Sequence, residues 1–385
     1  MELDDLSFDW DDYTGRLQSL DRAQIISIMD DYYNSDLSVA KIRSKYSISK
    51  NIRNLSREFP FVLLDEKCPY DYTHLIKQMP SRSGYSAGIP KCPICGHELR
   101  ENCQCDGCQE KRKVIRKQKR DKIVSAYSTN IDKVNYEELT ASSKIFLAAF
   151  LDAGLNDEAT KVSGKRILEN KLSPTDEFTQ LILDRLLADH IILVDPESPV
   201  EAFPEDNFPN AYYTYKVNYL INVELKSNGL GSLEYPDRKD IVKHKEECLG
   251  VWKQIALYEC LEYLIGQMQE ARFEFNPKEK TKLVINHLIE EYSIGQIWNL
   301  IYGSVNNAAA WYQKSNVSKR HAANSAITTL NNRGDRAKAE GWNLRSYHRN
   351  YDNKLSQISM VFFDSILQIG REGYEKTPSI DLINE

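Results

Sequence analysis

Residues 91–108 read KCPICGHELRENCQCDGC and contain two Cys-x-x-Cys pairs with nine residues between them. Zn²⁺ is bound tetrahedrally by four soft ligands, and two such pairs on facing turns supply them without a large hydrophobic core. The spacing therefore predicts one zinc ion in a small β ribbon, and an ion with four thiolates has a structural role because no position is open to water. The predicted ligands are Cys92, Cys95, Cys105 and Cys108.

Neighbouring residues leave this ligand set open. Cys103 lies close enough in sequence to replace Cys105, and His97 is able to replace a thiolate. Upstream, Cys68-Pro-Tyr-Asp71 has the form of another Cys-x-x-Cys turn with an aspartate in the second position, so Cys68 is an alternative partner for the first pair in a longer ribbon. Unligated thiols or a redox pair are the remaining alternative, and two Cys-x-x-Cys units within seventeen residues argue against it.

The composition is that of a globular chain. With 385 residues, 41% hydrophobic and 28% charged, we expect about two to four domains. No apolar run approaches the roughly 18 residues of a membrane span. The first residues, MELDDLSFDWDD, lack the basic start and apolar core of a signal peptide, so we expect a cytoplasmic protein with reduced thiols.

Charge is distributed unevenly over the first sixty residues. The net charge of −6 disfavours a chain that coats nucleic acid through its overall charge. Locally, residues 1–36 hold ten Asp/Glu against two arginines, whereas residues 37–60 hold six Lys/Arg against one glutamate. The basic segment is therefore a candidate for phosphate contact. The acidic leader either folds over this segment as a competitor of DNA or forms a solvating tail.

Three short helices are predicted in this N-terminal part. Apolar spacing favours a helix over residues 22–34, and Ser38 and Ser49 are natural N-caps for SVAKIRSKY and SKNIRNLSREF. The stretch LSVAKIRSKYSISKNIRNL resembles the helix-turn-helix of small DNA-binding domains, such as those of recombinases and sigma-like regulators. With the zinc ribbon added, the chain resembles helix-turn-helix plus zinc-ribbon nucleic-acid-binding proteins as a class.

In the third predicted helix, Ile52, Leu55 and Phe59 face the core, which leaves basic and polar side chains outward. Arginine pairs with guanine, asparagine with adenine and lysine with phosphate, so these side chains suit a DNA groove. The predicted contacts are Lys41, Arg43, Lys50, Asn51, Arg53, Asn54 and Arg57. The alternative is a bundle of three helices that docks another protein and has an ordinary solvated face.

A strongly basic run follows Cys108 directly. Residues 109–123 read QEKRKVIRKQKRDKI and carry eight Lys/Arg against two acids. A helix of this sequence repels itself and favours a polyanion beside it. We expect phosphate contacts from Arg112, Arg116, Lys119 and Arg120. The alternative is a solvated charge run without a ligand.

The middle of the chain is predicted to combine helices with short strands. Helices over 141–153 and 174–189, followed by a strand at 190–194 and a turn, resemble a winged helix. The turn region 195–206 carries five acids, which favours contact with protein over contact with DNA.

From about residue 240 the chain is predicted to be helical. Apolar stripes predict buried helices over 294–312 and 355–369, the second ending at Gly370. Ser318 is an expected N-cap that places Lys319 and Arg320 in a first helical turn, where the helix dipole disfavours cations and a bound anion would offset this. The alternative is a solvent-facing basic surface.

No catalytic motif is evident. Gly-rich phosphate loops, G-x-S-x-G and H-E-x-x-H are absent, and the seven histidines show no metal-triad spacing. We therefore expect a protein without enzymatic activity, although scattered nuclease carboxylates would not form a motif.

The sequence thus predicts a mainly α, multidomain chain. Its predicted parts are an acidic leader with a helix-turn-helix (1–62), a zinc ribbon with a basic helix (63–125), a winged-helix-like segment (126–208) and a helical C-terminal domain (209–385). The leading hypothesis is a non-enzymatic DNA-binding protein with structural Zn²⁺. The alternative is a protein-interaction or scaffold subunit of a larger bacterial nucleoprotein or defence assembly, which binds partners through the middle and C-terminal segments. A nuclease or an RNA-binding protein comes third.

Overall fold

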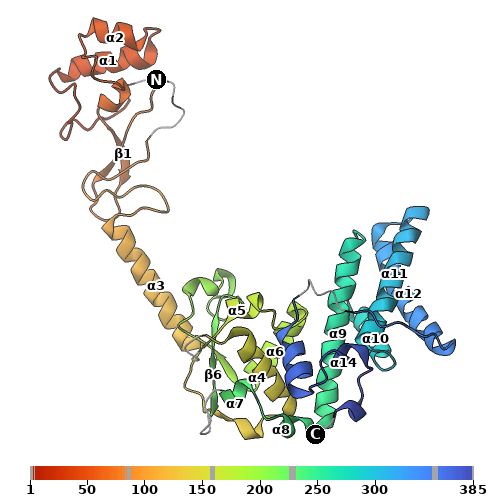
Figure 1. Cartoon of the computed structure of the whole chain (residues 1–385). Coiled ribbons are helices and arrows are strands. Elements are labelled where there is room, and N and C mark those ends of the chain that lie inside the picture. Colours follow the sequence, from red (N-terminus) through yellow and green to blue (C-terminus); the bar gives the residue numbers. More distant parts are fainter. Residues whose placement is uncertain are drawn as a thin grey trace. The chain divides into compact units, whose positions relative to one another are not determined.

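The computed structural model describes residue 3, residues 5–82, residue 84, and residues 88–156, 161–224, 231–348 and 354–383. The chain forms two compact units, Met1–Lys119 and Arg120–Glu385. Helices are the main regular structure of the described residues and the strands are short, which confirms the predicted mainly α class (Figure 1).

The first unit combines helices with one hairpin. Its elements are α1 (Arg22–Asn34), α2 (Val39–Lys45), the 3₁₀ helix η1 (Leu55–Glu58), β1 (Val62–Lys67), β2 (His74–Lys77) and most of α3 (Asp106–Ala126). The strands β1 and β2 are antiparallel. The Ser38 side chain accepts a hydrogen bond from the Lys41 backbone N–H at 3.4 Å, which confirms the predicted N-cap of α2.

The acidic leader packs into the core of the first unit. Phe8 forms an antiparallel bridge with Val62, and the Leu63 N–H donates to the Ser7 carbonyl at 2.8 Å. Phe8 and Leu17 are buried with the apolar side chains of α1. The leader is therefore part of the folded core beside β1, which excludes the solvating tail.

The third predicted helix, SKNIRNLSREF, is wrong: only the four residues of η1 are helical there. Other side chains take the carbonyls that an α-helix would use. The Arg43 guanidinium donates to the carbonyls of Ile52 and Arg53, the second at 3.1 Å, and the Gln78 side chain donates to the Ser56 carbonyl at 2.9 Å. Because these carbonyls already have partners, the segment stays irregular and still buries its apolar side chains.

The second unit begins with helices packed on a small sheet. Its first elements are β3 (Val134–Asn135), η2 (Tyr136–Glu138), α4 (Ala141–Gly154), β4 (Lys161–Ser163), α5 (Gly164–Glu169), α6 (Asp176–Ala188), β5 (Ile192–Val194), η3 (Val200–Ala202), η4 (Glu205–Asn207), β6 (Asn218–Ile221) and β7 (Val223–Glu224). The strand β6 lies between β4 and β5 and is antiparallel to both, while β3 and β7 form a separate parallel pair. Tyr219 of β6 is buried against Phe150 of α4, with ring centroids 5.7 Å apart.

The rest of the second unit is helical. Its elements are α7 (Gly231–Glu234), α8 (Arg238–Val242), α9 (Lys245–Glu270), α10 (Glu279–Ile289), α11 (Ile294–Lys314), α12 (Lys319–Ala339), α13 (Gln357–Met360), the π-helical turn η5 (Val361–Ile366), α14 (Glu372–Glu375) and η6 (Ile380–Leu382). The stripe predicted in α11 is buried at Ile294, Ile297 and Ile301, which confirms it. The stripe predicted over 355–369 is buried at Ile358, Phe362 and Ile366, but α13 and η5 share it in place of one helix. Gly370 follows with a φ of 51°.

Candidate metal centre

Two groups of metal-binding side chains lie in the first unit. The first metal group consists of Cys68, Asp71, Cys92 and Cys95, and its ligand atoms all lie within 4.8 Å of one another. The Cys68 and Cys95 sulfurs are 3.5 Å apart, and the Cys92 sulfur lies 3.1 Å from Asp71 Oδ2. The group joins the link between β1 and β2 to the turn after Lys91.

The second metal group consists of His97, Cys103, Cys105 and Cys108, within the same 4.8 Å limit. His97 Nδ1 lies 3.7 Å from the Cys105 sulfur and 3.3 Å from the Cys108 sulfur. Cys108 is in the first turn of α3, so this group holds the beginning of the basic helix.

The distances fit tetrahedral coordination of one ion by each group. With Zn–S near ~2.3 Å and Zn–N near ~2.05 Å, tetrahedral geometry puts two sulfurs about 3.8 Å apart and a sulfur about 3.6 Å from a nitrogen. The sulfur–sulfur distance of 3.5 Å and the nitrogen–sulfur distances of 3.7 and 3.3 Å lie close to these values. Each group could therefore hold a metal ion.

Tight turns aim these donors at a common centre. After Cys95 the chain turns at Gly96, which has a φ of 69°, a conformation in which glycine carries no Cβ penalty. The Cys95 backbone N–H points at the Cys92 sulfur at 3.5 Å, and the Glu98 N–H points at the Cys103 sulfur at 3.1 Å. Such N–H groups stabilise a thiolate, the form that binds metal.

The ionisation of the thiols follows from burial and from these N–H groups. Burial raises the pKa of Cys92, and it raises the pKa of Cys105 to about 11. Burial of Cys103 also opposes ionisation, but the backbone N–H groups of Cys105 and Glu98 outweigh it and lower the pKa of Cys103 to about 6. These hydrogen bonds favour the thiolate form of Cys103, which is the form that binds metal.

Tyr70 lies next to the second metal group, although it belongs to the turn of the first. Its hydroxyl donates to the Cys108 sulfur at 3.1 Å, and its ring meets the His97 ring edge-on with centroids 5.3 Å apart. A Cβ added at Gly107 would lie 2.7 Å from the Tyr70 ring, so only glycine allows the start of α3 to approach so closely. Tyr70 is therefore not itself a donor of the second metal group, but it helps to orient two of the donors, Cys108 and His97.

The four thiols predicted to share one ion are divided between the two groups. Cys92 and Cys95 lie with Cys68 and Asp71, whereas Cys105 and Cys108 lie with His97 and Cys103. The alternative donors considered in the sequence, Cys68, His97 and Cys103, therefore each belong to one of the two groups. The signal for the first metal group is the repeat of Cys-Pro-x-donor at 68–71 and 92–95.

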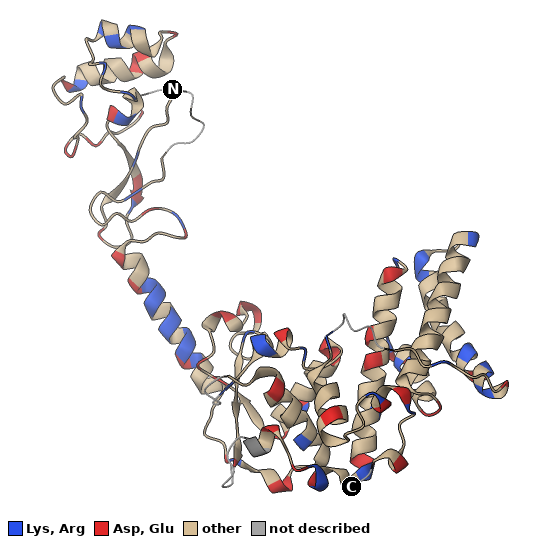
Figure 2. Cartoon of the chain, in the orientation of Figure 1, with Lys and Arg blue, Asp and Glu red and all other residues tan. Residues whose placement is uncertain are grey.

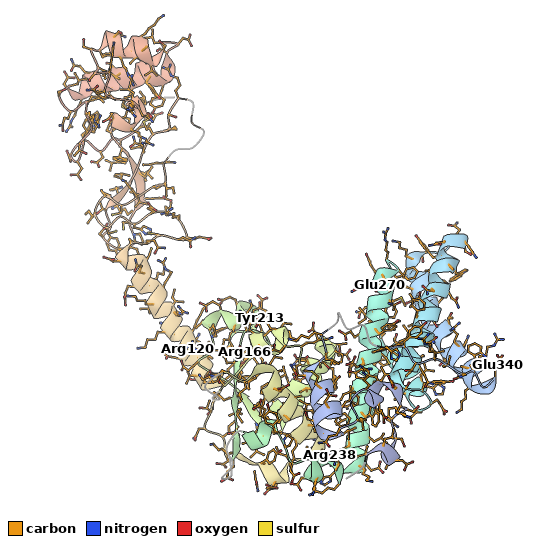
Figure 3. All side chains as sticks on the ribbon, in the orientation of Figure 1. Arg120, Arg166, Tyr213, Arg238, Glu270 and Glu340 are labelled. Atoms are coloured by element: carbon orange, nitrogen blue, oxygen red, sulfur yellow. The ribbon has the colours of Figure 1, made fainter. Side chains whose placement is uncertain are left out.

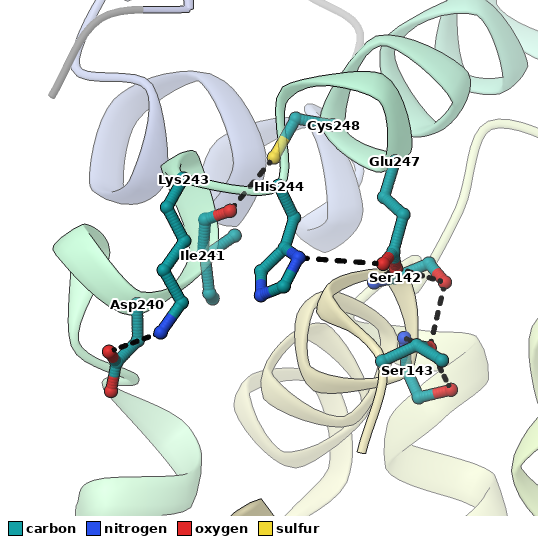
Figure 4. A network of polar contacts seen from close by, with 9 residues as sticks. Ser142, Ser143, Asp240, Ile241, Lys243, His244, Glu247 and Cys248 are labelled. Carbon is teal, nitrogen blue, oxygen red and sulfur yellow. Dashed lines mark hydrogen bonds and ion pairs between the residues drawn. The ribbon is translucent and has the colours of Figure 1, made fainter. Parts of the chain in front are cut away.

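Two further cysteines lie outside both groups. Cys248 and Cys260 are fully buried in the second unit, and burial raises the pKa of Cys248 to about 11 and that of Cys260 well above its usual range. The Cys248 thiol faces the Ile241 carbonyl at 3.5 Å, within a polar network in which Glu247 accepts from the Ser142 N–H (Figure 4). Burial and the raised pKa values keep both thiols protonated and away from solvent.

The residues predicted to contact DNA from the helix-turn-helix lie in different settings. Lys50, Asn51, Arg53, Asn54 and Arg57 are exposed, but on the irregular segment and on η1. Lys41 is exposed on α2, whereas Arg43 turns inward to the carbonyls named above. Without the third helix, no recognition helix carries these side chains.

The basic run forms the predicted helix, α3. Residues 109–118 are all exposed, and Figure 2 shows Lys and Arg on successive turns. At its beginning Arg112 donates to the Cys103 carbonyl at 2.7 Å. Further along the helix lies Arg120, which is labelled in Figure 3. It donates to the carbonyls of Pro196 and Ser198, the second at 2.8 Å.

The remaining predicted contacts lie on α3 and α12. Arg116 is exposed on α3 and Lys119 is half-buried there. Ser318 accepts from the His321 N–H at 3.2 Å, which confirms the predicted N-cap and places Lys319 and Arg320, both exposed, in the first turn of α12.

No protein-family model, curated protein or solved structure matches this chain. Among the described residues, every helix is too short or too polar to cross a membrane.

Proposed function

We propose that this chain is a DNA-binding protein whose first unit is folded around zinc and whose helix α3 lies against the phosphate backbone of a duplex. The observation that carries the proposal is α3 itself. It bears eight Lys/Arg against three acids, and its exposed run begins directly at the second metal group. A helix with so much charge of one sign is stabilised by a polyanion beside it.

The dimensions of α3 suit a duplex. The exposed residues 109–118 span about 15 Å at ~1.5 Å per residue, which is close to half of one turn of B-form DNA at roughly 34 Å. The ion pair between Lys113 and Glu110, 3.7 Å long, is about 70% exposed on both sides, so phosphate can displace it at little cost.

The identity of the metal as zinc rests on the donors. Six of the eight donors are cysteine sulfurs, and the other two are a histidine and an aspartate. Soft sulfur and imidazole ligands in tetrahedral arrangement favour zinc over Mg²⁺ or Ca²⁺, which prefer oxygen. Such closed sites stabilise a fold and leave no position for catalysis.

The geometry favours contacts with the phosphate backbone of DNA over contacts with the edges of its bases. Lys50, Arg53 and Arg57 are exposed on a segment without a helix that could enter a major groove, so we propose phosphate contacts for them too. Phosphate contacts position a protein without reading sequence. The proposed binding is therefore strong in low salt and weakly selective for sequence.

The test is fluorescence anisotropy of a labelled duplex titrated with the full chain at several salt concentrations. The Lys113→Ala/Lys117→Ala variant removes two cations from one face of α3. We expect weaker binding, and a slope of log K against log[salt] that is smaller by about 0.9 for each phosphate that the variant no longer neutralises. The matched control is Lys278→Ala/Lys280→Ala in the second unit, which removes the same charge from exposed positions. Equal slopes for both variants would refute the proposal.

A second candidate function concerns α6 in the second unit. We infer a winged-helix-like module from the order α4, β4, α5, α6, β5, β6 with β6 in the middle of the sheet. In such modules the helix in the place of α6 reads DNA, yet the exposed charges of α6 are Asp176, Glu177 and Asp184 against Arg185. This acidic face repels phosphate and suits a basic protein partner.

Substitutions on α6 distinguish these roles. The Gln180→Lys/Leu181→Lys variant should leave the affinity for duplex DNA and its salt slope unchanged, because α6 lies outside the proposed interface. A tighter complex would place α6 on the DNA. A protein partner of this face should no longer co-purify with the variant, whereas Lys280→Ala should retain it.

A further inference from the structure

We propose that the first unit holds two zinc ions that exchange at different rates, and that the ion bound by Cys68, Asp71, Cys92 and Cys95 is the exchangeable one. The two donor sets differ in chemistry, because an aspartate oxygen completes the first metal group and a histidine nitrogen completes the second. Sulfur and imidazole are the donors that zinc prefers, whereas carboxylate oxygen suits harder ions. The first metal group therefore contains the weakest donor.

The chain around Asp71 supports its role as a ligand. Cys68-Pro-Tyr-Asp71 and Cys92-Pro-Ile-Cys95 share the order cysteine, proline, large residue, donor, so Asp71 stands where the second turn has a thiol. The Thr73 N–H donates to Asp71 Oδ1 at 3.1 Å, and the other carboxylate oxygen lies 3.1 Å from the Cys92 sulfur. The carboxylate is thus held at the same centre as the three sulfurs.

Solvent reaches the two groups unequally. In the first metal group two of the four donors, Asp71 and Cys95, are only partly buried. In the second metal group none of the four donors is exposed, and His97 and Cys103 are buried. A chelator replaces ligands one at a time, so exchange begins at a donor that is both accessible and weakly bound.

The neighbours of the second metal group also oppose release. The Tyr70 hydroxyl donates to the Cys108 sulfur, and the Glu98 N–H donates to the Cys103 sulfur, both at 3.1 Å. In the first metal group the N–H of Cys95 lies farther from the Cys92 sulfur, at 3.5 Å. Outer hydrogen bonds of this kind raise metal affinity by about 10- to 100-fold. Since Cys108 belongs to this group, release of the exchangeable ion leaves the first turn of α3 held.

The test is the zinc content of the purified full chain and the time course of zinc release to EDTA. We expect two ions per chain, one released at least about tenfold faster than the other. Asp71→Ala should contain one ion and lack the fast phase, and Asp71→Cys should contain two ions that are both released slowly. The matched control is Asp65→Ala on β1, an exposed aspartate, which should keep both ions and both phases.

One ion per unsubstituted chain, or two ions released in a single phase, overturns the proposal. A fast phase of zinc release that persists in the Asp71→Cys chain also overturns the proposal. If Asp71→Ala does not fold, the Asp71→Cys variant still provides the test. The readout is metal alone, so its outcome is separate from that of the DNA-binding test.

Discussion

The Tyr70 hydroxyl offers a precise test of how the second metal group is held. Tyr70→Phe removes the hydrogen bond to the Cys108 sulfur, 3.1 Å long, and keeps the ring that packs on Gly107 and His97. A hydrogen bond to a charged acceptor contributes about 1.5–3 kcal/mol, and the lower end applies because Tyr70 is half-buried. A loss of about 1.5 kcal/mol corresponds to about tenfold weaker zinc binding.

The assay is competition for zinc between the protein and a chelating dye, together with the slow phase of release. The second metal group should bind about tenfold more weakly in Tyr70→Phe, while the first metal group is unaffected. The matched control is Tyr72→Phe, because Tyr72 is 74% exposed two residues away. A Tyr70→Phe chain with the same zinc affinity as the control would refute the role assigned to the hydroxyl.

Three further predictions concern stability. Arg43→Met should destabilise the first unit by about 2 kcal/mol, because two carbonyls lose a charged donor, whereas exposed Lys41→Met should not; urea denaturation measures both. Burial raises the pKa of Tyr13 from 10.0 to about 12, so the folded state prefers the protonated phenol. The stability that comes from this pKa difference is fully present below pH 10 and is lost as the pH rises towards 12. Tyr13→Phe should therefore lose less stability at alkaline pH than the unsubstituted chain, as measured by circular dichroism during unfolding. Gly164→Ala should lower the melting temperature, since its Cβ would lie 2.5 Å from a backbone oxygen, whereas Gly266→Ala in the open face of α9 should raise stability by about 0.5–1 kcal/mol.

Cysteine spacing predicts the region in which the candidate metal donors lie, but not which of these donors come together in one group. A Cys-x-x-Cys pair fixes two sulfurs in one turn, and the partner turn is chosen by tertiary structure. Here the β1–β2 hairpin brings Cys68 and Asp71 to the pair at 92–95, so the pair at 105–108 takes His97 and Cys103 instead. Because one donor of the first metal group is Asp71, a search for cysteine pairs alone does not find this group.

A helix could be predicted from the sequence where its own residues determine it, and not where side chains from distant parts of the chain do. The runs in α3 and α11 are long and their patterns are set within the helix, so the sequence alone predicts them. The third helix of the N-terminal segment depends on carbonyls that distant side chains occupy, Arg43 from α2 and Gln78 after β2. Burial of Ile52 fits a helix and an irregular segment equally well, so apolar spacing does not separate the two.

The second metal group and the basic helix α3 are connected through Cys108, which belongs to both. A helix with eight cations and exposed Val114 and Ile115 has no apolar face to stabilise it over residues 109–118, and nucleation of a free helix is costly. The second metal group fixes the first turn, and buried Ile123 together with the bonds of Arg120 fixes the last turns. Both ends of α3 are therefore ordered in the chain without a ligand, so the binding of DNA that we propose would not have to overcome the free-energy cost of folding this helix.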